Sequence, residues 1–244
     1  MYNIIKDFEN IHKMNTIKED ITEVETVNIV EEVTEAITIT KVESEANSQL
    51  KQDYIYIFTV DWFSSNIPIW THYLKELKDK PNLHFLEIGS FQGRSTVWLL
   101  ENILTNDTST ITCIDTFEGS IEHVIAFQND IKNLFDIFSH NISKFKNKVN
   151  IIKDKSQLAL KQINEQYDFI YIDGDHKASS VLEDAILSFS LLKKDGIMIF
   201  DDYMWFGMET YIDNPKPAID AFLDIYADKI TVLYKGYQVL IKKL

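Results

Sequence analysis

Residues 83–96 read Leu-His-Phe-Leu-Glu-Ile-Gly-Ser-Phe-Gln-Gly-Arg-Ser-Thr. The short apolar run Leu83–Ile88 lacks a regular polar alternation, which is typical of a strand buried on both faces. Gly89 and Gly93 follow as turn residues, and the segment 94–104 then carries apolar side chains at helical spacing. A buried strand, a glycine turn and a helix in this order predict the first unit of a parallel α/β sheet.

The same alternation continues along the chain. A helix is expected after Pro68, further strands at 110–117, 149–153, 168–172 and 196–200, and further helices at 131–145, 156–163, 179–192 and 217–227. Such an order predicts a doubly wound, Rossmann-like sheet with helices on both faces. Two last strands, 229–234 and 238–242, are joined by Lys-Gly-Tyr and predict a closing hairpin with an antiparallel strand.

The N-terminal segment differs from the rest of the chain in composition. Residues 1–50 hold eleven acidic side chains against four lysines, and they contain no Gly and no Pro. We interpret them as a poorly ordered acidic extension, with a small paired element as the alternative. Residues 51–244 are interpreted as the single folded domain.

Charge and composition restrict the partners. The net charge is −14, which disfavours nucleic acid because phosphate backbones are bound by Lys and Arg. No apolar run reaches the roughly 20 residues of a membrane span, and the start lacks a secretory signal pattern. The lone Cys113 excludes an internal disulfide, so we expect a cytoplasmic protein.

Polar residues follow the first two buried strands. Gly89 and Gly93 would let a ligand approach the backbone and the free N–H groups at the helix start. The spacing differs from that of dinucleotide binders, and Glu87 suits a cationic or hydroxyl-rich ligand. Asp115, at the end of the second strand, is placed to accept hydrogen bonds from ribose hydroxyls. A plain tight turn at the glycines and a turn cap at Asp115 are the alternatives.

The third strand is followed by Asp154 and Ser156, which could address an adenine edge. Ser156 is equally suited to be a helix N-cap, and for this pair the structural interpretation is favoured.

Acidic groups and a histidine gather after the fourth and fifth strands. The fourth ends in Asp173-Gly174-Asp175-His176 and the fifth in Asp201-Asp202. Neighbouring carboxylates repel one another unless a cation neutralises them, and oxygens of Asp173, Asp201 and Asp202 suit Mg²⁺. Capping and solvated loops are the alternative. His176 is the favoured base because an unperturbed imidazole titrates at about 6.5, and Asp175 competes for that role.

These motifs together resemble the class I S-adenosylmethionine-dependent methyltransferases. The two-strand acid site is similar to that of metal-dependent O-methyltransferases acting on macrolide and aminocoumarin sugars, and more distantly of catechol O-methyltransferases. The resemblance implies strand order 3-2-1-4-5-7-6, Mg²⁺ on Asp173, Asp201 and Asp202, and His176 or Asp175 as base. It implies S-adenosylmethionine contacts, with Asp115 at the ribose; the full expected set is Glu87, Gly89, Ser90, Gly93, Ser95, Asp115, Thr116, Asp154, Ser156 and Asp173.

The expected function is therefore O-methylation of a sugar or another vicinal diol, a small-molecule partner. A metal-independent methyltransferase and a non-catalytic S-adenosylmethionine-binding protein are the alternatives. A nicotinamide-dependent dehydrogenase is disfavoured by the missing glycine fingerprint and the closing hairpin. The segment Tyr203-Met204-Trp205-Phe206-Gly207-Met208, together with Trp62, Phe63 and Trp70, is interpreted as a sugar platform or, equally, a hydrophobic lid. A homo-oligomer is conceivable.

Overall fold

Seven strands form one sheet in the order β3-β2-β1-β4-β5-β7-β6, which confirms the expected topology. The structure is a computed structural model, and it describes residues 54–119 and 132–244. The strands are β1 (His84–Ile88), β2 (Thr110–Asp115), β3 (Val149–Lys153), β4 (Tyr167–Ile172), β5 (Leu192–Phe200), β6 (Ile230–Lys235) and β7 (Val239–Lys243). The interpretation of residues 1–50 lies outside the described residues.

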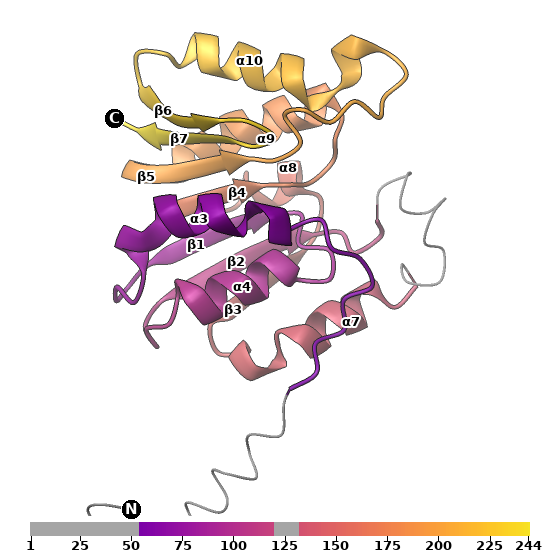
Figure 1. The fold of residues 1–244 in the computed structure, drawn as a ribbon, viewed down its shortest axis with the longest axis vertical. Helices are drawn as coiled ribbons and strands as arrows, with labels where there is room; N and C mark the ends of the chain where they lie inside the picture. Colours follow the sequence, from indigo (N-terminus) through magenta and orange to yellow (C-terminus); the bar gives the residue numbers. More distant parts are fainter. Residues whose placement is uncertain (1–53, 120–131) are drawn as a thin grey trace, which may run out of the picture. The chain divides into compact units, whose positions relative to one another are not determined.

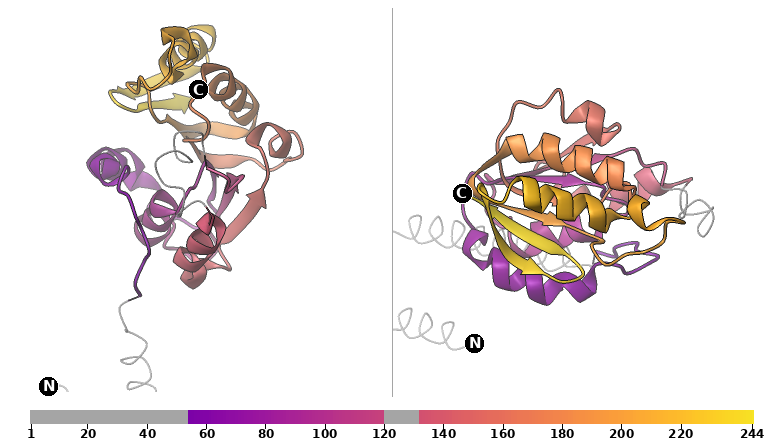
Figure 2. Two further views of the ribbon diagram at one scale, coloured as in Figure 1. Left: turned by 90° about the vertical axis from the view of Figure 1, so that its right-hand side faces the viewer. Right: turned by 90° about the horizontal axis from the view of Figure 1, so that it is seen from above.

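Helices cover both faces of the sheet. They are α3 (Ile67–Leu74), α4 (Arg94–Asn102), α7 (Leu134–Asn141), α8 (Ser156–Ala159), α9 (Ala178–Leu191) and α10 (Pro215–Ile225), with short 3-10 turns η1 (Ser64–Asn66), η2 (Lys75–Leu77), η3 (Ser143–Phe145) and η4 (Tyr211–Asp213). In Figure 1, α3 and α4 lie in front of the sheet. The right-hand view of Figure 2 shows α9 and α10 on one side and the indigo α3 on the other.

Alternate side chains of the central strands pack into two separate hydrophobic cores, one on each face of the sheet. On β4, Phe169 and Tyr171 pack with α3, α4 and α7, whereas Ile170 and Ile172 pack with α9 and α10. This alternation follows from the two-residue period of a strand. Both faces of β1 are likewise covered, as the apolar run Leu83–Ile88 predicted.

Several elements differ in length from the sequence prediction, among them α7, which ends at Asn141 instead of 145 and is followed by the turn η3. Helix α8 ends at Ala159 instead of 163, because Ala159 and Leu160 are already buried and the Gln162 N–H closes a turn onto the Ala159 carbonyl at 3.0 Å. Strand β5 begins at Leu192, four residues before the expected Gly196, and an irregularity in its pairing with β4 accommodates the extra length.

The closing hairpin places the start of β7 beside the carboxyl ends of the parallel strands. Strand β7 pairs antiparallel with β5, and its first residue Val239 lies opposite Phe200, the last residue of β5. The residues just before β7 therefore lie beside those just after β5. No helix within the described ranges has the length and hydropathy of a membrane span.

Candidate active site

The loop after β1, residues 89–93, lies directly against the end of β4. Gly89 has a φ of +81°, and a Cβ atom there would lie 1.9 Å from the backbone oxygen of Asp173. Gly93 has a φ of +80°, and its Cβ would lie 2.9 Å from the Phe138 ring. Only glycine combines this left-handed backbone with such close approach, so both glycines are explained by packing between the loop and its neighbours.

Glu87 points into the protein beneath this loop. Its side chain is fully buried and accepts hydrogen bonds from the hydroxyls of Ser90 (2.8 Å), Ser95 (2.6 Å) and Thr96. Burial raises the pKa of Glu87 against the opposing effect of these three donors. The structure thus joins three of the predicted cofactor residues, Glu87, Ser90 and Ser95, in a network that fastens the loop to α4.

Asp115 fastens the same loop to the end of β2. One carboxylate oxygen accepts the N–H groups of Ser90 (2.7 Å) and Phe91 (2.9 Å), and the other accepts that of Phe117 (2.7 Å). The adjacent Thr116 hydroxyl accepts the Glu118 N–H at 3.3 Å. Asp115 therefore caps its own turn, as the alternative interpretation expected, and also holds the glycine loop; its contact with a ribose stays a prediction.

Asp154 and Ser156 follow β3, as predicted, but the N-cap interpretation of Ser156 is wrong. Lys155 occupies the N-cap position and Ser156 is the first helical residue. Its hydroxyl is engaged by Asp184, whose Oδ1 also accepts the Gln157 side-chain amide at 3.0 Å. The Asp154 carboxylate accepts the N–H of Lys155. The buried Asp184 of α9 was not recognised in the sequence, since a lone acid in a helix gives no local signal.

Replacing Asp184 by Asn should change how stability depends on pH. Burial raises the pKa of Asp184 to about 7, with a smaller contribution from Glu183 and Asp175. The folded protein then keeps a proton that the unfolded chain releases, so the unfolding free energy of the wild type falls as pH rises from about 4 to 7. We expect Asp184→Asn to be more stable than wild type at pH 8 by roughly 2–4 kcal/mol, and by less at pH 5. Urea unfolding at both pH values measures this, and equal differences at both would contradict it.

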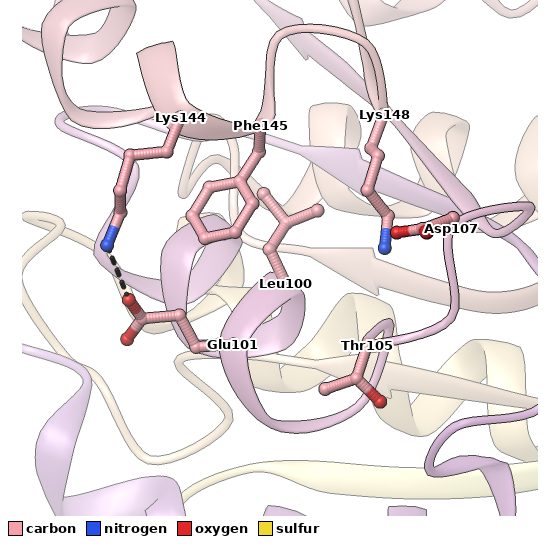
Figure 3. Close-up of a pocket in the computed structure, with 7 residues that line it drawn as sticks. All are labelled: Leu100, Glu101, Thr105, Asp107, Lys144, Phe145 and Lys148. Carbon is pink, nitrogen blue, oxygen red and sulfur yellow. Dashed lines mark hydrogen bonds and ion pairs between the residues drawn. The ribbon is translucent and has the colours of Figure 1, made fainter. Parts of the chain in front are cut away.

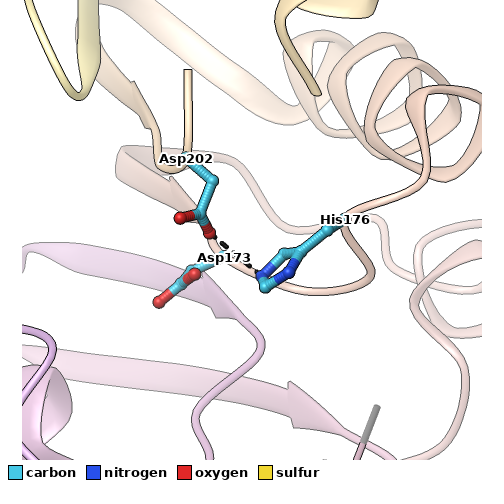
Figure 4. Close-up of side chains that lie close together, drawn as sticks. All are labelled: Asp173, His176 and Asp202. Atoms are coloured by element: carbon cyan, nitrogen blue, oxygen red, sulfur yellow. Dashed lines mark ion pairs between the residues drawn. The ribbon is translucent and has the colours of Figure 1, made fainter. Parts of the chain in front are cut away.

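Three groups converge just beyond β4 and β5. One oxygen or nitrogen atom from each of Asp173, His176 and Asp202 lies within 4.8 Å of the other two (Figure 4). His176 Nε2 lies 3.0 Å from an Asp202 oxygen, and both side chains are mostly buried. Asp202 holds this position with a left-handed φ of +57°, a backbone strain typical of functional sites. The loops after two neighbouring strands thus meet as the sequence predicted.

Asp201, the third acid of the predicted metal site, lies next to this group but is not one of the three residues that converge, and its carboxylate faces inward. One of its oxygens accepts the Tyr171 hydroxyl and the Gln238 side-chain amide, the latter at 2.8 Å. The Tyr171 hydroxyl also lies 2.9 Å from an oxygen of Asp173, so two carboxylates share one donor. Burial, followed by Asp202, raises the pKa of Asp201 to about 6. Burial, followed by Asp201 and Asp202, raises the pKa of Asp173 well above its usual range.

The two candidate bases are placed differently. Asp175 is exposed, and its carboxylate accepts the Lys177 N–H at 3.2 Å and the Ser180 hydroxyl at 2.7 Å. It therefore orders the start of α9. His176 points toward Asp173 and Asp202, and its ring lies 4.7 Å from that of Trp205. Only His176 of the pair joins the group of acids.

Two residues of the closing hairpin complete the site and were missed in the sequence. The Tyr237 hydroxyl donates to Asp202 at 3.1 Å, and Gln238 is wholly buried against Asp201. Burial and Asp202 raise the pKa of Tyr237, which keeps its phenol protonated as a donor. The predicted closing hairpin could have pointed to them, because an antiparallel last strand brings the Lys-Gly-Tyr turn to the end of the fifth strand.

The aromatic residues near the site divide into two groups. Phe63 and Trp70 are buried, so they belong to the core and not to a ligand platform. Trp62 and Phe206 are each 53% exposed, and Met204 is 47% exposed. Tyr203 is also buried, whereas Trp205 is partly exposed beside His176. An acceptor surface would therefore be made by Trp62, Met204, Trp205 and Phe206.

A separate hollow lies at the opposite edge of the sheet. It has a volume of about 620 Å³ and lies between the end of α4 and the turn before β3 (Figure 3). Its lining residues are Leu100, Glu101, Thr105, Asp107, Lys144, Phe145 and Lys148. Because ligands of such sheets bind at the carboxyl ends of the strands, this hollow is not part of the candidate site.

The strand order, the antiparallel β7 and the glycine loop after β1 define the class I methyltransferase fold. Residues 86–203 match the profile of a family described as a methyltransferase domain, in agreement with this fold. This confirms the resemblance seen in the sequence.

Individual proteins with related sequence or structure are distant. An uncharacterized protein of Acanthamoeba polyphaga mimivirus is 27% identical over 176 residues, which are 68% of this chain and 73% of that protein. The O-methyltransferase from Bacillus cereus, solved with S-adenosylhomocysteine, is 17% identical with a TM-score of 0.52, and the match covers 93% of each chain. MycE from the mycinamycin biosynthetic pathway, solved with Mg, S-adenosylhomocysteine and mycinamycin VI, is 15% identical with a TM-score of 0.56, covering 75% of this chain and 50% of that one.

Proposed function

We propose that the protein is a Mg²⁺-dependent O-methyltransferase that transfers the methyl group of S-adenosylmethionine to a hydroxyl of a sugar or another vicinal diol. The observation that carries the proposal is the meeting of Asp173, His176 and Asp202 directly beside the glycine loop. A metal site, a base and a cofactor loop at one edge of the sheet are the parts such a transfer needs.

The acid group fits a hard divalent cation. Asp173, Asp201 and Asp202 offer carboxylate oxygens, the ligands that Mg²⁺ prefers. Asp173 and Asp201 are both partly buried and share one hydroxyl donor, so their charge is poorly compensated by the residues around them. A bound cation would bring two adjacent acceptor hydroxyls together and make one of them more acidic. MycE, a protein of similar fold, was solved with Mg, S-adenosylhomocysteine and mycinamycin VI, and this supports the proposal.

His176 is the group we assign to proton removal. An acceptor hydroxyl placed beside Asp173 and Asp202 lies within reach of this imidazole, whereas the Asp175 carboxylate is committed to the start of α9. Once His176 has taken the proton, the Asp202 oxygen 3.0 Å from Nε2 stabilises the imidazolium. We assign cofactor binding to the loop after β1 and to Asp115 after β2, because ligands of such sheets bind at the carboxyl ends of the strands.

The proposal is tested by comparing His176→Asn with Asp175→Asn. Transfer of labelled methyl from S-adenosylmethionine is measured on methyl glycosides, macrolide glycosides and catechol. We expect His176→Asn to lower kcat by about 100- to 10,000-fold, the usual worth of a general base. Its affinity for S-adenosylhomocysteine, measured by calorimetry, should stay at the wild-type value. Asp175→Asn serves as the matched control and should retain transfer.

Three outcomes contradict parts of this assignment. Loss of transfer in Asp175→Asn alone would move the base to that residue. Full activity of the wild type in excess chelator would favour a metal-independent methyltransferase. Cofactor binding with no transfer to any acceptor hydroxyl, in wild type with Mg²⁺, would favour a non-catalytic cofactor-binding protein.

A further inference from the structure

Strand β7 carries a buried side chain into the site from the end of the chain. Because Val239 lies opposite Phe200, Gln238 comes to lie beside Asp201, and the Tyr237 carbonyl accepts the N–H of Tyr203 at 2.9 Å. The hairpin is therefore fixed by backbone bonds at the point where the two aspartates follow β5. A side chain at position 238 has a defined place relative to them.

The orientation of Gln238 is fixed by Trp70 of α3. The indole N–H of Trp70 donates to Gln238 Oε1 at 2.8 Å, and an indole nitrogen can only donate. The oxygen of the amide must therefore face Trp70, and its NH₂ group must face Asp201, which it reaches at 2.8 Å. Both Gln238 and Trp70 are 0% exposed, so water cannot replace either contact.

Tyr171 links Asp201 back to Trp70 and so completes a closed set of contacts. Its hydroxyl reaches both Asp201 and Asp173, and its aromatic ring packs edge-on against Trp70 with centroids 4.8 Å apart. Trp70, Gln238, Asp201 and Tyr171 thus hold one another in a closed circuit of hydrogen bonds and ring packing. A circuit of this kind leaves the Asp201 carboxylate little freedom to rotate.

We infer that Gln238, held by Trp70, is a positioning residue that sets the direction of the Asp201 carboxylate and, through Tyr171, of Asp173 toward a divalent cation. The inference rests on the proposed function, since it concerns the same metal site. Groups behind the ligands are known to set ligand direction in metal sites, and their loss typically lowers metal affinity by about 10- to 100-fold.

The test is the affinity for Mn²⁺, a paramagnetic substitute for Mg²⁺, measured by electron paramagnetic resonance on the full chain with S-adenosylhomocysteine present. We expect Gln238→Met, which keeps the length of the side chain but removes its donor, to bind Mn²⁺ about 10- to 100-fold more weakly than wild type. Trp70→Phe removes the indole N–H that orients Gln238, together with part of the ring that packs on Tyr171, and should weaken binding in the same direction. If Gln238→Met does not fold, the Mn²⁺ affinity of Trp70→Phe tests the inference in its place.

Tyr73→Phe is the matched control. Tyr73 lies on the same helix as Trp70, and its hydroxyl donates to the Leu233 carbonyl of the same hairpin at 2.9 Å, without contact to the acids. Tyr73→Phe loosens the hairpin without touching the acids, so its Mn²⁺ affinity should stay within about threefold of wild type. Such a result would show that the loss of affinity in Gln238→Met does not come from general loosening of the hairpin. Wild-type affinity in Gln238→Met, or an equal loss in Tyr73→Phe, overturns the inference. Absence of Mn²⁺ binding in the wild type itself would instead remove the proposed metal site, and the inference with it.

Discussion

Asp173→Asn is expected to reduce methyl transfer by at least about 1000-fold, because a cation site that has lost one carboxylate gives up several kcal/mol of transition-state stabilisation. Asp173 is also the residue that the glycine loop packs against, but through its backbone oxygen, which the substitution leaves in place. The affinity for S-adenosylhomocysteine should therefore stay within about tenfold of wild type. Initial rates over a range of Mg²⁺ concentrations, together with calorimetry, measure both quantities.

The control for this prediction is another aspartate changed in the same way. Asp195 is an exposed acid paired with Lys242 at 2.8 Å, far along β5 from the site, and Asp195→Asn should transfer methyl groups at the wild-type rate. An excess of chelator should reduce the wild type to the level of Asp173→Asn. If Asp173→Asn works at the wild-type rate, the metal-dependent mechanism is wrong even if the fold and cofactor assignments remain correct.

The largest loss of stability is expected from Gly89→Ala. An added Cβ would lie 1.9 Å from the Asp173 backbone oxygen and 2.8 Å from Gly174 Cα, atoms that cannot rotate away, and alanine would also have to adopt a φ of +81°. Overpacking and the left-handed backbone together should cost about 3 kcal/mol or more of unfolding free energy. Urea unfolding monitored by circular dichroism measures the change.

Gly174→Ala is the matched control, since it lies on the other side of the same contact. Its Cβ would meet nothing closer than 3.4 Å, at Ile88 Cγ2, and its φ is not in the left-handed region. We expect a change within about 1 kcal/mol. A Gly89→Ala protein as stable as wild type would show that the loop after β1 can move away from β4.

Much of the fold could be read from local patterns. The run Leu83–Ile88 predicted a strand buried on both faces, and the polar residues after the fourth and fifth strands predicted a shared site, because parallel strands end at one edge of a sheet. Local patterns did not predict that β7 lies between β5 and β6; this part of the strand order was implied by the resemblance to the methyltransferase family. Helix α8 was predicted too long because apolar spacing does not show where the chain must turn to begin the next strand.

By itself, then, the sequence determined the order of strands and helices, the glycine loop and the gathering of Asp173, His176, Asp201 and Asp202, since each follows from short-range periodicity or from the end of a strand. The directions of side chains were decided only by the tertiary structure. Glu87 turns into the protein because three hydroxyls of the loop and α4 satisfy it there, and Asp175 turns away because it orders α9. Gln238 enters the site because antiparallel pairing of β7 with β5 joins distant segments, and no local pattern encodes such a register.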